Sequence, residues 1–246
     1  MPFRDLRKTC QQNPKEDHKL SFWNISIYLS WIFIKLKIHP DYVTYLGIFA
    51  GIISAIFFST GIWECQIIGS FLYLLWQILD CCDGEVARFY SRTGVYDLDY
   101  KQKKALSGDF IESIQHSIVD SLVFAGIGIG IYITNPTFIY LLAAIFSPLF
   151  STFLRDVHKA RKIAMYESNV PIDKTEENNR RKTLLNFRLI IYKIHVDSGI
   201  LWIIISIAAF FRLLNFLIVF YTFSSFFLIL TSIHLSRGRA LKYGRI

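Results

Sequence analysis

Six long apolar stretches decide what this chain can fold into. Of its 246 residues 53% are hydrophobic and the mean hydropathy is +0.37, which is too apolar for an ordinary soluble domain of this size. A stretch of about 20 apolar residues crosses a bilayer as a helix, because a helix satisfies its own backbone hydrogen bonds there. We therefore predict an all-α polytopic membrane protein. Its six transmembrane helices are expected at residues 43–61, 66–82, 111–133, 137–154, 196–211 and 213–233.

The positions of the basic residues orient these six helices. All of the 27 Lys and Arg residues except Arg212 lie in the first 40 residues, in the 83–108 and 155–195 connections, or after residue 233. Cytoplasmic segments of membrane proteins carry such an excess of positive charge. We therefore expect a multi-pass protein with both termini and both long connections in the cytoplasm. The short external turns would lie near Ile62, Asn135 and Arg212.

The net charge of +8 has the same explanation. Basic residues orient a membrane protein and attract anionic lipids, and no soluble nucleic-acid-binding fold accompanies them, so we expect no nucleic-acid partner. The four cysteines predict no disulfide framework, because Cys10, Cys81 and Cys82 would be cytoplasmic and Cys65 alone outside. A zinc site at Cys81 and Cys82 is disfavoured, since no Cys-x-x-Cys partner exists.

The chain divides into three parts. Residues 1–40 are predicted to form a cytoplasmic N-terminus, residues 41–236 the transmembrane domain, and residues 237–246 a basic cytoplasmic tail. Residues 23–37 are apolar with scattered polar positions and end in lysines, which predicts an amphipathic helix lying in the membrane interface. The first twenty residues are polar and charged, so we expect no secretory leader.

A charged run ends the second apolar stretch. Residues 80–88 read Asp-Cys-Cys-Asp-Gly-Glu-Val-Ala-Arg. Carboxylates in a membrane-length segment are costly and usually functional. Asp80 and Asp83 are three residues apart and share one helix face, where they can hold one cation. The alternative is a solvated helix end at the membrane surface.

This run resembles the signature of the CDP-alcohol phosphotransferase family, Asp-x-x-Asp-Gly-x-x-Ala-Arg followed by Gly-x-x-x-Asp-x-x-x-Asp. The first half is complete here. The nearest match to the second half begins at Gly108, where Glu112 and His116 replace the third and fourth aspartates. It follows a spacer, residues 89–107, that is longer than the family's. Residues 40–44, Pro-Asp-Tyr-Val-Thr, resemble the element that opens the family's first membrane helix.

The resemblance implies a homodimeric membrane enzyme with its active site facing the cytoplasm. It would transfer a substituted phosphoryl group from a CDP-linked donor to an alcohol, release CMP, and use Mg²⁺ or Mn²⁺. The metal ligands carried over to this sequence are Asp80, Asp83, Glu112 and His116. The residues carried over to the CDP moiety are Asp41, Thr44, Gly84, Ala87 and Arg88.

His116 replaces the aspartate that serves the family as the proposed general base. An imidazole with an unperturbed pKa of about 6.5 accepts an alcohol proton at neutral pH, so we expect His116 to be catalytic. Histidine is a poorer ligand for Mg²⁺, so the site would tolerate Mn²⁺ or use a water instead. Asp120, one turn further on, would orient the imidazole. The alternative is a degenerated site on a non-catalytic relative that binds CDP.

The two substrates are less constrained by the sequence. The commoner family chemistry uses CDP-diacylglycerol and a small alcohol in phospholipid synthesis, whereas the alternative transfers the head group of a CDP-alcohol to a lipid hydroxyl. Arg155 would bind the phosphate of a phosphorylated acceptor, although positive-inside anchoring also explains it. Residues 89–107 are predicted to be a solvated loop or, alternatively, a lid over the nucleotide. A transporter is disfavoured, because its acidic residues should lie near the bilayer midplane.

Overall fold

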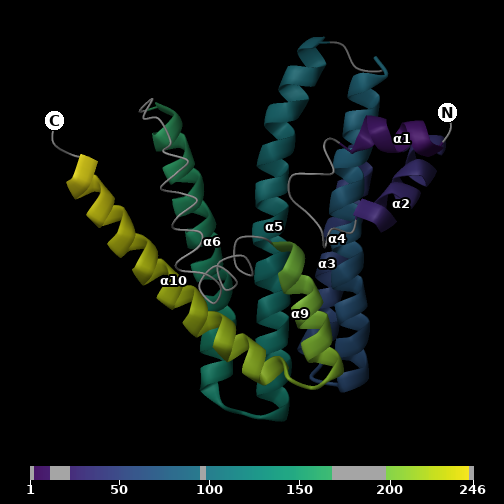
Figure 1. Ribbon diagram of the computed structural model, residues 1–246. Helices are drawn as coiled ribbons and strands as arrows, with labels where there is room; N and C mark the ends of the chain where they lie inside the picture. Colours follow the sequence, from purple (N-terminus) through teal and green to yellow (C-terminus); the bar gives the residue numbers. More distant parts are fainter. Residues whose placement is uncertain (1–2, 12–22, 95–97, 168–197, 244–246) are drawn as a thin grey trace.

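The computed structural model describes residues 3–11, 23–94, 98–167 and 198–243, and for parts of these helices the backbone alone. Within these ranges the chain is helical and holds no strand, which confirms the predicted all-α class. Figure 1 shows the helices as a bundle with two small helices beside one end of α4. They are α1 (Phe3–Cys10), α2 (Trp23–Lys35), α3 (Pro40–Ser59), α4 (Trp63–Arg92), α5 (Leu98–Thr134), α6 (Phe138–Glu167), α9 (Ser198–Phe210) and α10 (Leu214–Tyr243).

Four of the helices are long and apolar enough to cross a membrane. They are α3, α4, residues Ile114–Thr134 of α5 and residues Leu214–Thr231 of α10. The other two predicted spans fall on shorter apolar segments in the described part of the chain, Phe138–Leu154 in α6 and Leu201–Phe210 in α9. The membrane-length helices are therefore present, and crossing by α6 and α9 stays a prediction.

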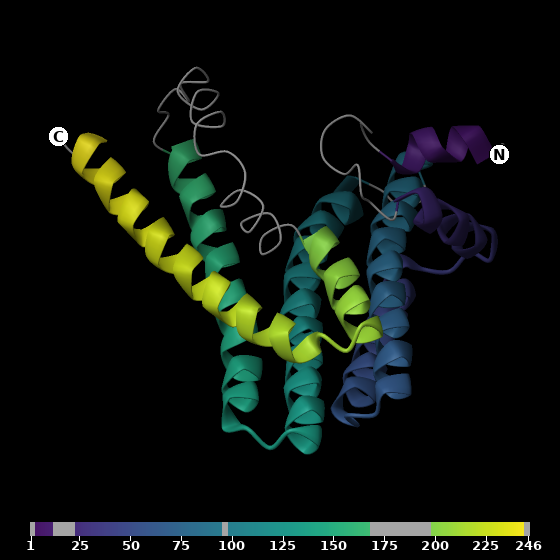
Figure 2. The same ribbon diagram turned by 60° about the horizontal axis from the view of Figure 1, so that its bottom comes forward.

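The long helices α3, α4 and α5 form the centre of the bundle (Figure 1). The helices α1, α2 and α9 pack on α4. Helix α6 lies against α5, and α10 packs mainly on α6 and also contacts α5 and α9. Figure 2 shows α1 and the C-terminal end of α10 at the same end of the bundle. At the other end the predicted turns meet, and Gly61, Asn135 and Arg212 line one cavity of about 450 Å³.

Three alternating glycines let α5 approach helices on two sides. A Cβ at Gly126 would overlap the carbonyl oxygen of Ala55, and one at Gly130 would overlap that of Phe58, both in α3. A Cβ at Gly128 would overlap Ala144 of α6. Small residues spaced by four along a helix permit such close backbone contact in membranes, where van der Waals packing drives association.

Two segments differ from the sequence prediction. The predicted loop at residues 89–107 is mostly helix, because α4 continues to Arg92 and α5 begins at Leu98. The Lys, Gln, Ala and Leu residues at 98–107 are strong helix formers, and they continue the apolar helix that follows. Gly94, with a φ of 77°, lies just beyond α4 and suits a helix C-terminus. The second segment, α1, was not predicted, whereas α2 covers most of the predicted interfacial helix.

Gly130→Ala is expected to lower the unfolding temperature of the protein in detergent. The added methyl group must displace the backbone of α3 at Phe58. Overpacking of this kind costs about 1–3 kcal/mol, which exceeds the roughly 1 kcal/mol that Ala gains over Gly in a helix. Ile129→Ala, at a position 43% exposed in the bundle, serves as the control and should change the unfolding temperature less. An unchanged unfolding temperature in Gly130→Ala would contradict the close α3–α5 contact.

Candidate functional site

The complete half of the motif lies on the C-terminal part of α4, where side chains of α3 and α5 reach it. Thr44 of α3 contacts Asp83, and Gln115 and His116 of α5 contact Asp80. The structure thus brings together four of the predicted site residues, from three helices. Because α4 is helical through this run, Asp80 and Asp83 lie about one turn apart on neighbouring parts of its surface.

Both carboxylate oxygens of Asp80 have partners on α5. Gln115 donates its side-chain amide to Oδ1, and Nε2 of His116 lies 3.4 Å from Oδ2. The side chains of His116 and Asp80 are only 12% and 13% exposed. A partly buried carboxylate needs such partners, because desolvation of its charge is otherwise costly.

Two tryptophans enclose the His116 ring. The ring of Trp76 in α4 meets it edge-on with centroids 5.1 Å apart, and Trp202 of α9 stacks on it with centroids 6.2 Å apart. Trp76 and Trp202 are almost fully buried. Packing of this kind restricts the ring to one orientation, so that Nε2 is directed toward Asp80 while Nδ1 is turned into the interior.

Asp83 is tied to the start of α3. The Thr44 hydroxyl lies 2.6 Å from Oδ2 of Asp83 and 3.2 Å from the Pro40 carbonyl oxygen, and its single proton favours the charged acceptor. Pro40 occupies the first turn of α3, where its missing N–H is not needed. The motif aspartate and the predicted upstream element therefore meet directly.

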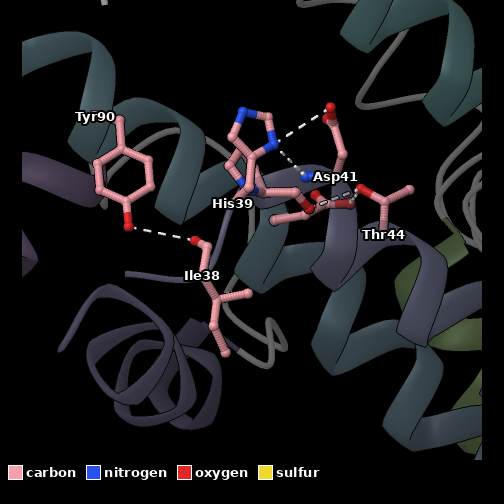
Figure 3. Close-up of polar contacts among 7 residues, drawn as sticks. Ile38, His39, Asp41, Thr44 and Tyr90 are labelled. Carbon is pink, nitrogen blue, oxygen red and sulfur yellow. Dashed lines mark hydrogen bonds and ion pairs between the residues drawn. The ribbon is translucent and has the colours of Figure 1, made fainter. Parts of the chain in front are cut away.

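His39 is the N-cap residue of α3, and its ring nitrogen Nδ1 makes two contacts with Asp41 (Figure 3). Its Nδ1 lies 3.4 Å from the backbone nitrogen of Asp41 and 3.3 Å from Oδ2 of the same residue. Nδ1 would accept in the first contact and donate in the second, so one ring nitrogen does not make both hydrogen bonds at once. The Tyr90 hydroxyl of α4 donates to the Ile38 carbonyl at 3.3 Å (Figure 3). This hydrogen bond holds the segment just before α3 against α4.

Glu85, at a variable position of the motif, is completely buried. Its Oε1 accepts hydrogen bonds from Gln11, just beyond α1, and from Ser26 of α2, both at 2.8 Å. Its Oε2 accepts from Ser30 of α2 at 2.6 Å. Three donors compensate for burying the charge. Glu85 is not among the site residues predicted from the sequence, where the spacing of Ser26 and Ser30 by one helical turn was the available signal.

Arg88 and Arg92 bind the C-terminal end of α1. Nε of Arg88 donates to the Cys10 carbonyl and Nη1 of Arg92 to the Thr9 carbonyl, each at 2.6 Å. The guanidinium of Arg88 folds back over Gly84, where a Cβ would lie 3.1 Å from Nη1. The space beside Gly84, where another residue would have a Cβ atom, is therefore next to the guanidinium of Arg88.

The remaining residues that the sequence predicted for the site lie apart from these contacts or outside the described side chains. Asp120, expected beside the imidazole, accepts a 2.8 Å hydrogen bond from the Tyr73 hydroxyl, while Asp80 faces Nε2 of His116. Ala87 is half-buried on α4. The side chains of Glu112 and Arg155 lie outside the described residues, and among the described ones no group of three His, Cys, Asp or Glu side chains is gathered for a metal.

The cavity at the turns is remote from this site. It is lined by the first turn of α4, including Trp63 and Glu64, whereas Asp80 lies nearly five helical turns further along. The cavity is therefore not evidence for a site at the motif residues, which are brought together by the direct side-chain contacts described above.

Comparison with known proteins adds no relative. The sequence matches no known protein-family model and no curated protein. The resemblance to the CDP-alcohol phosphotransferases therefore rests on the motif residues themselves.

Tyr73→Phe is expected to destabilise the protein by about 1–3 kcal/mol, because Asp120 is 7% exposed and loses a buried hydroxyl donor. Tyr132→Phe, at a position 37% exposed, is the matched control and should have little effect. The measurement is thermal unfolding in detergent for both variants. Equal unfolding temperatures in the two variants would show that the Tyr73–Asp120 hydrogen bond contributes nothing.

Proposed function

We propose that this chain is an integral membrane CDP-alcohol phosphotransferase, which moves a substituted phosphoryl group from a CDP-linked donor to an alcohol and releases CMP. One observation carries the proposal. Side chains of three helices meet around the motif, with Thr44 on Asp83 and His116 on Asp80. This arrangement supports a single site where carboxylates, a base and an arginine act on one diphosphate. We take CDP-diacylglycerol as the donor and phospholipid synthesis as the setting.

The proposed reaction is a displacement at phosphorus. The alcohol oxygen forms a bond to the phosphorus that carries the donor's substituent, the bond from this phosphorus to the oxygen of CMP breaks, and CMP leaves with the electron pair. The alcohol proton passes to Nε2 of His116. Asp80, with Oδ2 3.4 Å from that nitrogen, stabilises the resulting imidazolium. Arg88 binds a donor phosphate through its planar set of N–H groups.

Mg²⁺ or Mn²⁺ would be held by the carboxylates of Asp80, Asp83 and Glu112, which supply the hard oxygen ligands that these ions prefer. The Thr44 hydroxyl on Asp83 fits this role, because hydrogen bonds to ligating carboxylates orient them. A bound ion supplies neutralisation of the diphosphate charge. The residues of the chain orient the donor and move the proton.

The proposed enzyme spans the membrane six times, with the short segments of α6 and α9 completing the four long helices. The motif faces the cytoplasm, because 26 of the 27 basic residues would lie on that side. Arg155 would contact a phosphorylated acceptor, and the homodimer follows from the family resemblance.

A second candidate is a non-catalytic protein that binds CDP. One observation favours it: both oxygens of Asp80 already contact side chains of α5. A metal ion would have to share this carboxylate with Gln115 and His116 or displace them. Turnover distinguishes the two candidates.

CMP release by the purified protein in detergent tests the proposal. CDP-diacylglycerol is presented with pooled alcohols and, separately, CDP-alcohols with diacylglycerol, each with Mg²⁺ or Mn²⁺. We expect metal-dependent release that Asp83→Asn abolishes, because this variant removes a ligand charge at nearly constant shape. The active pool also shows which substrate carries the lipid. Binding of CDP without release from any pool would favour the non-catalytic candidate.

His116→Ala is expected to lower kcat by about 100-fold or more while CDP binding persists, since a general base contributes roughly 10²–10⁴ in rate. The measurement is CMP release alongside binding of labelled CDP. Glu64→Gln, an exposed acidic position in the first turn of α4, is the control and should leave both unchanged. Wild-type turnover in His116→Ala would refute the base assignment.

A further inference from the structure

The guanidinium of Arg88 is fixed from outside the bundle. Its Nε donates to the carbonyl of Cys10, in the last turn of α1, at 2.6 Å. The last carbonyls of a helix have no partner within it and carry partial negative charge, so an arginine is a favourable cap. With Nε anchored in this way, Nη1 and Nη2 lie over Gly84, one residue from Asp83. The Nη1–Nη2 edge of the guanidinium, which can bind a phosphate, is thereby held over Gly84 of the motif segment.

The contact between α1 and α4 does not rest on Arg88 alone. Arg92, one turn further along, caps the Thr9 carbonyl, and Gln11 donates to the buried carboxylate of Glu85. Beneath these polar contacts the Leu6, Cys10 and Ile27 side chains form a small buried cluster, with Phe89 of α4 packed against it.

Glu85 joins both N-terminal helices to α4. It accepts from Gln11 on the α1 side and from Ser26 and Ser30 on the α2 side. These donors hold the buried carboxylate in place. If the carboxylate is removed, the side chains of Gln11, Ser26 and Ser30 lose their buried hydrogen-bond acceptor. Glu85 therefore links the α1 segment and α2 to the motif segment through its own hydrogen bonds.

We propose that Glu85 and the α1 segment position Arg88 for the diphosphate of the nucleotide donor, with Glu85 as a positioning residue. The inference rests on the proposed transferase function. It makes the N-terminal segment part of substrate binding: Glu85 holds Gln11, the docked α1 presents the Cys10 carbonyl, and that carbonyl sets the direction of the Arg88 guanidinium. An Arg88 released from α1 keeps its charge but samples many rotamers, so it binds the phosphate less tightly.

Two variants at one carboxylate separate positioning from general stability. Gln11→Ala removes the donor on the α1 side of Glu85, whereas Ser30→Ala, the matched control, removes a donor of the same carboxylate on the α2 side. Glu85→Leu removes all acceptors, and Glu85→Gln is the conservative variant, because its amide oxygen still accepts from Gln11.

The first readout needs no enzymatic activity. Cys10 is fully buried, and burial raises the pKa of its thiol to about 11, with the charge of Glu85 acting in the same direction. Cys10 should therefore resist maleimide in the wild type, as located by mass spectrometry of the labelled protein. We expect rapid labelling of Cys10 in Gln11→Ala and Glu85→Leu, and protection in Ser30→Ala and Glu85→Gln. Protection in Gln11→Ala and Glu85→Leu would overturn the proposal, because α1 would then not depend on this contact.

The second readout is the kinetics of CMP release. We expect the KM for the CDP donor to rise roughly ten-fold in Gln11→Ala with kcat nearly unchanged, because Arg88 binds ground state and transition state alike. Ser30→Ala should keep the wild-type KM, and Glu85→Gln should restore most of what Glu85→Leu loses. An unchanged KM in a Gln11→Ala variant that labels at Cys10 would overturn the positioning role alone. Absence of CMP release from the wild type would refute the proposed function, and the positioning role with it.

Discussion

The fold depends on finding partners for the carboxylates of one helix. Asp80, Asp83 and Glu85 lie within six residues of α4, in a segment whose preceding residues are almost all apolar. Each carboxylate obtains its partners from a different part of the chain: Asp80 from α5, Asp83 from α3, and Glu85 from α2 and from Gln11 just beyond α1. Because an unpaired charge in such a segment is costly, these contacts favour the observed neighbours of α4 in addition to apolar packing.

Helical geometry explains why the partners differ. Successive residues of an α-helix are rotated by about 100°, so Asp80 and Asp83 project about 60° apart whereas Glu85 projects on another side of α4. Asp80 and Asp83 contact side chains of α5 and α3, whereas Glu85 contacts Gln11, just beyond α1, and two serines of α2. Figure 1 shows α1 and α2 together beside one end of α4. Arg88 and Arg92, three and seven residues beyond Glu85, extend the Glu85 side of α4 and reach α1.

The sequence predicted the helices and the contacts of the motif better than it predicted the N-terminal segment. Long apolar stretches determine membrane-length helices almost directly. The motif resemblance assigned residues 40–44 and 80–88 to one site, and in the structure Thr44 and Asp83 of these two segments are in contact. Glu85 was missed because its partners Gln11, Ser26 and Ser30 are distant in the sequence. Trp202, which encloses His116 from α9, was missed for the same reason. The helical course of residues 98–107 was missed because alternating charge is typical of a loop as well as of an exposed helix.

The structure makes the two roles predicted for His116 compete for one atom. Nε2 faces Asp80, while Nδ1 is turned into the interior between the surrounding aromatic rings. A nitrogen has a single lone pair, so Nε2 serves either as a metal ligand or as the acceptor of the alcohol proton. The 3.4 Å separation between Nε2 and Oδ2 of Asp80 is longer than the 2.7–2.9 Å of a strong charge-assisted hydrogen bond. Protonation of Nε2 would strengthen the contact with Asp80, so in the proposed enzyme this position suits the base role and the carboxylates are the proposed metal ligands.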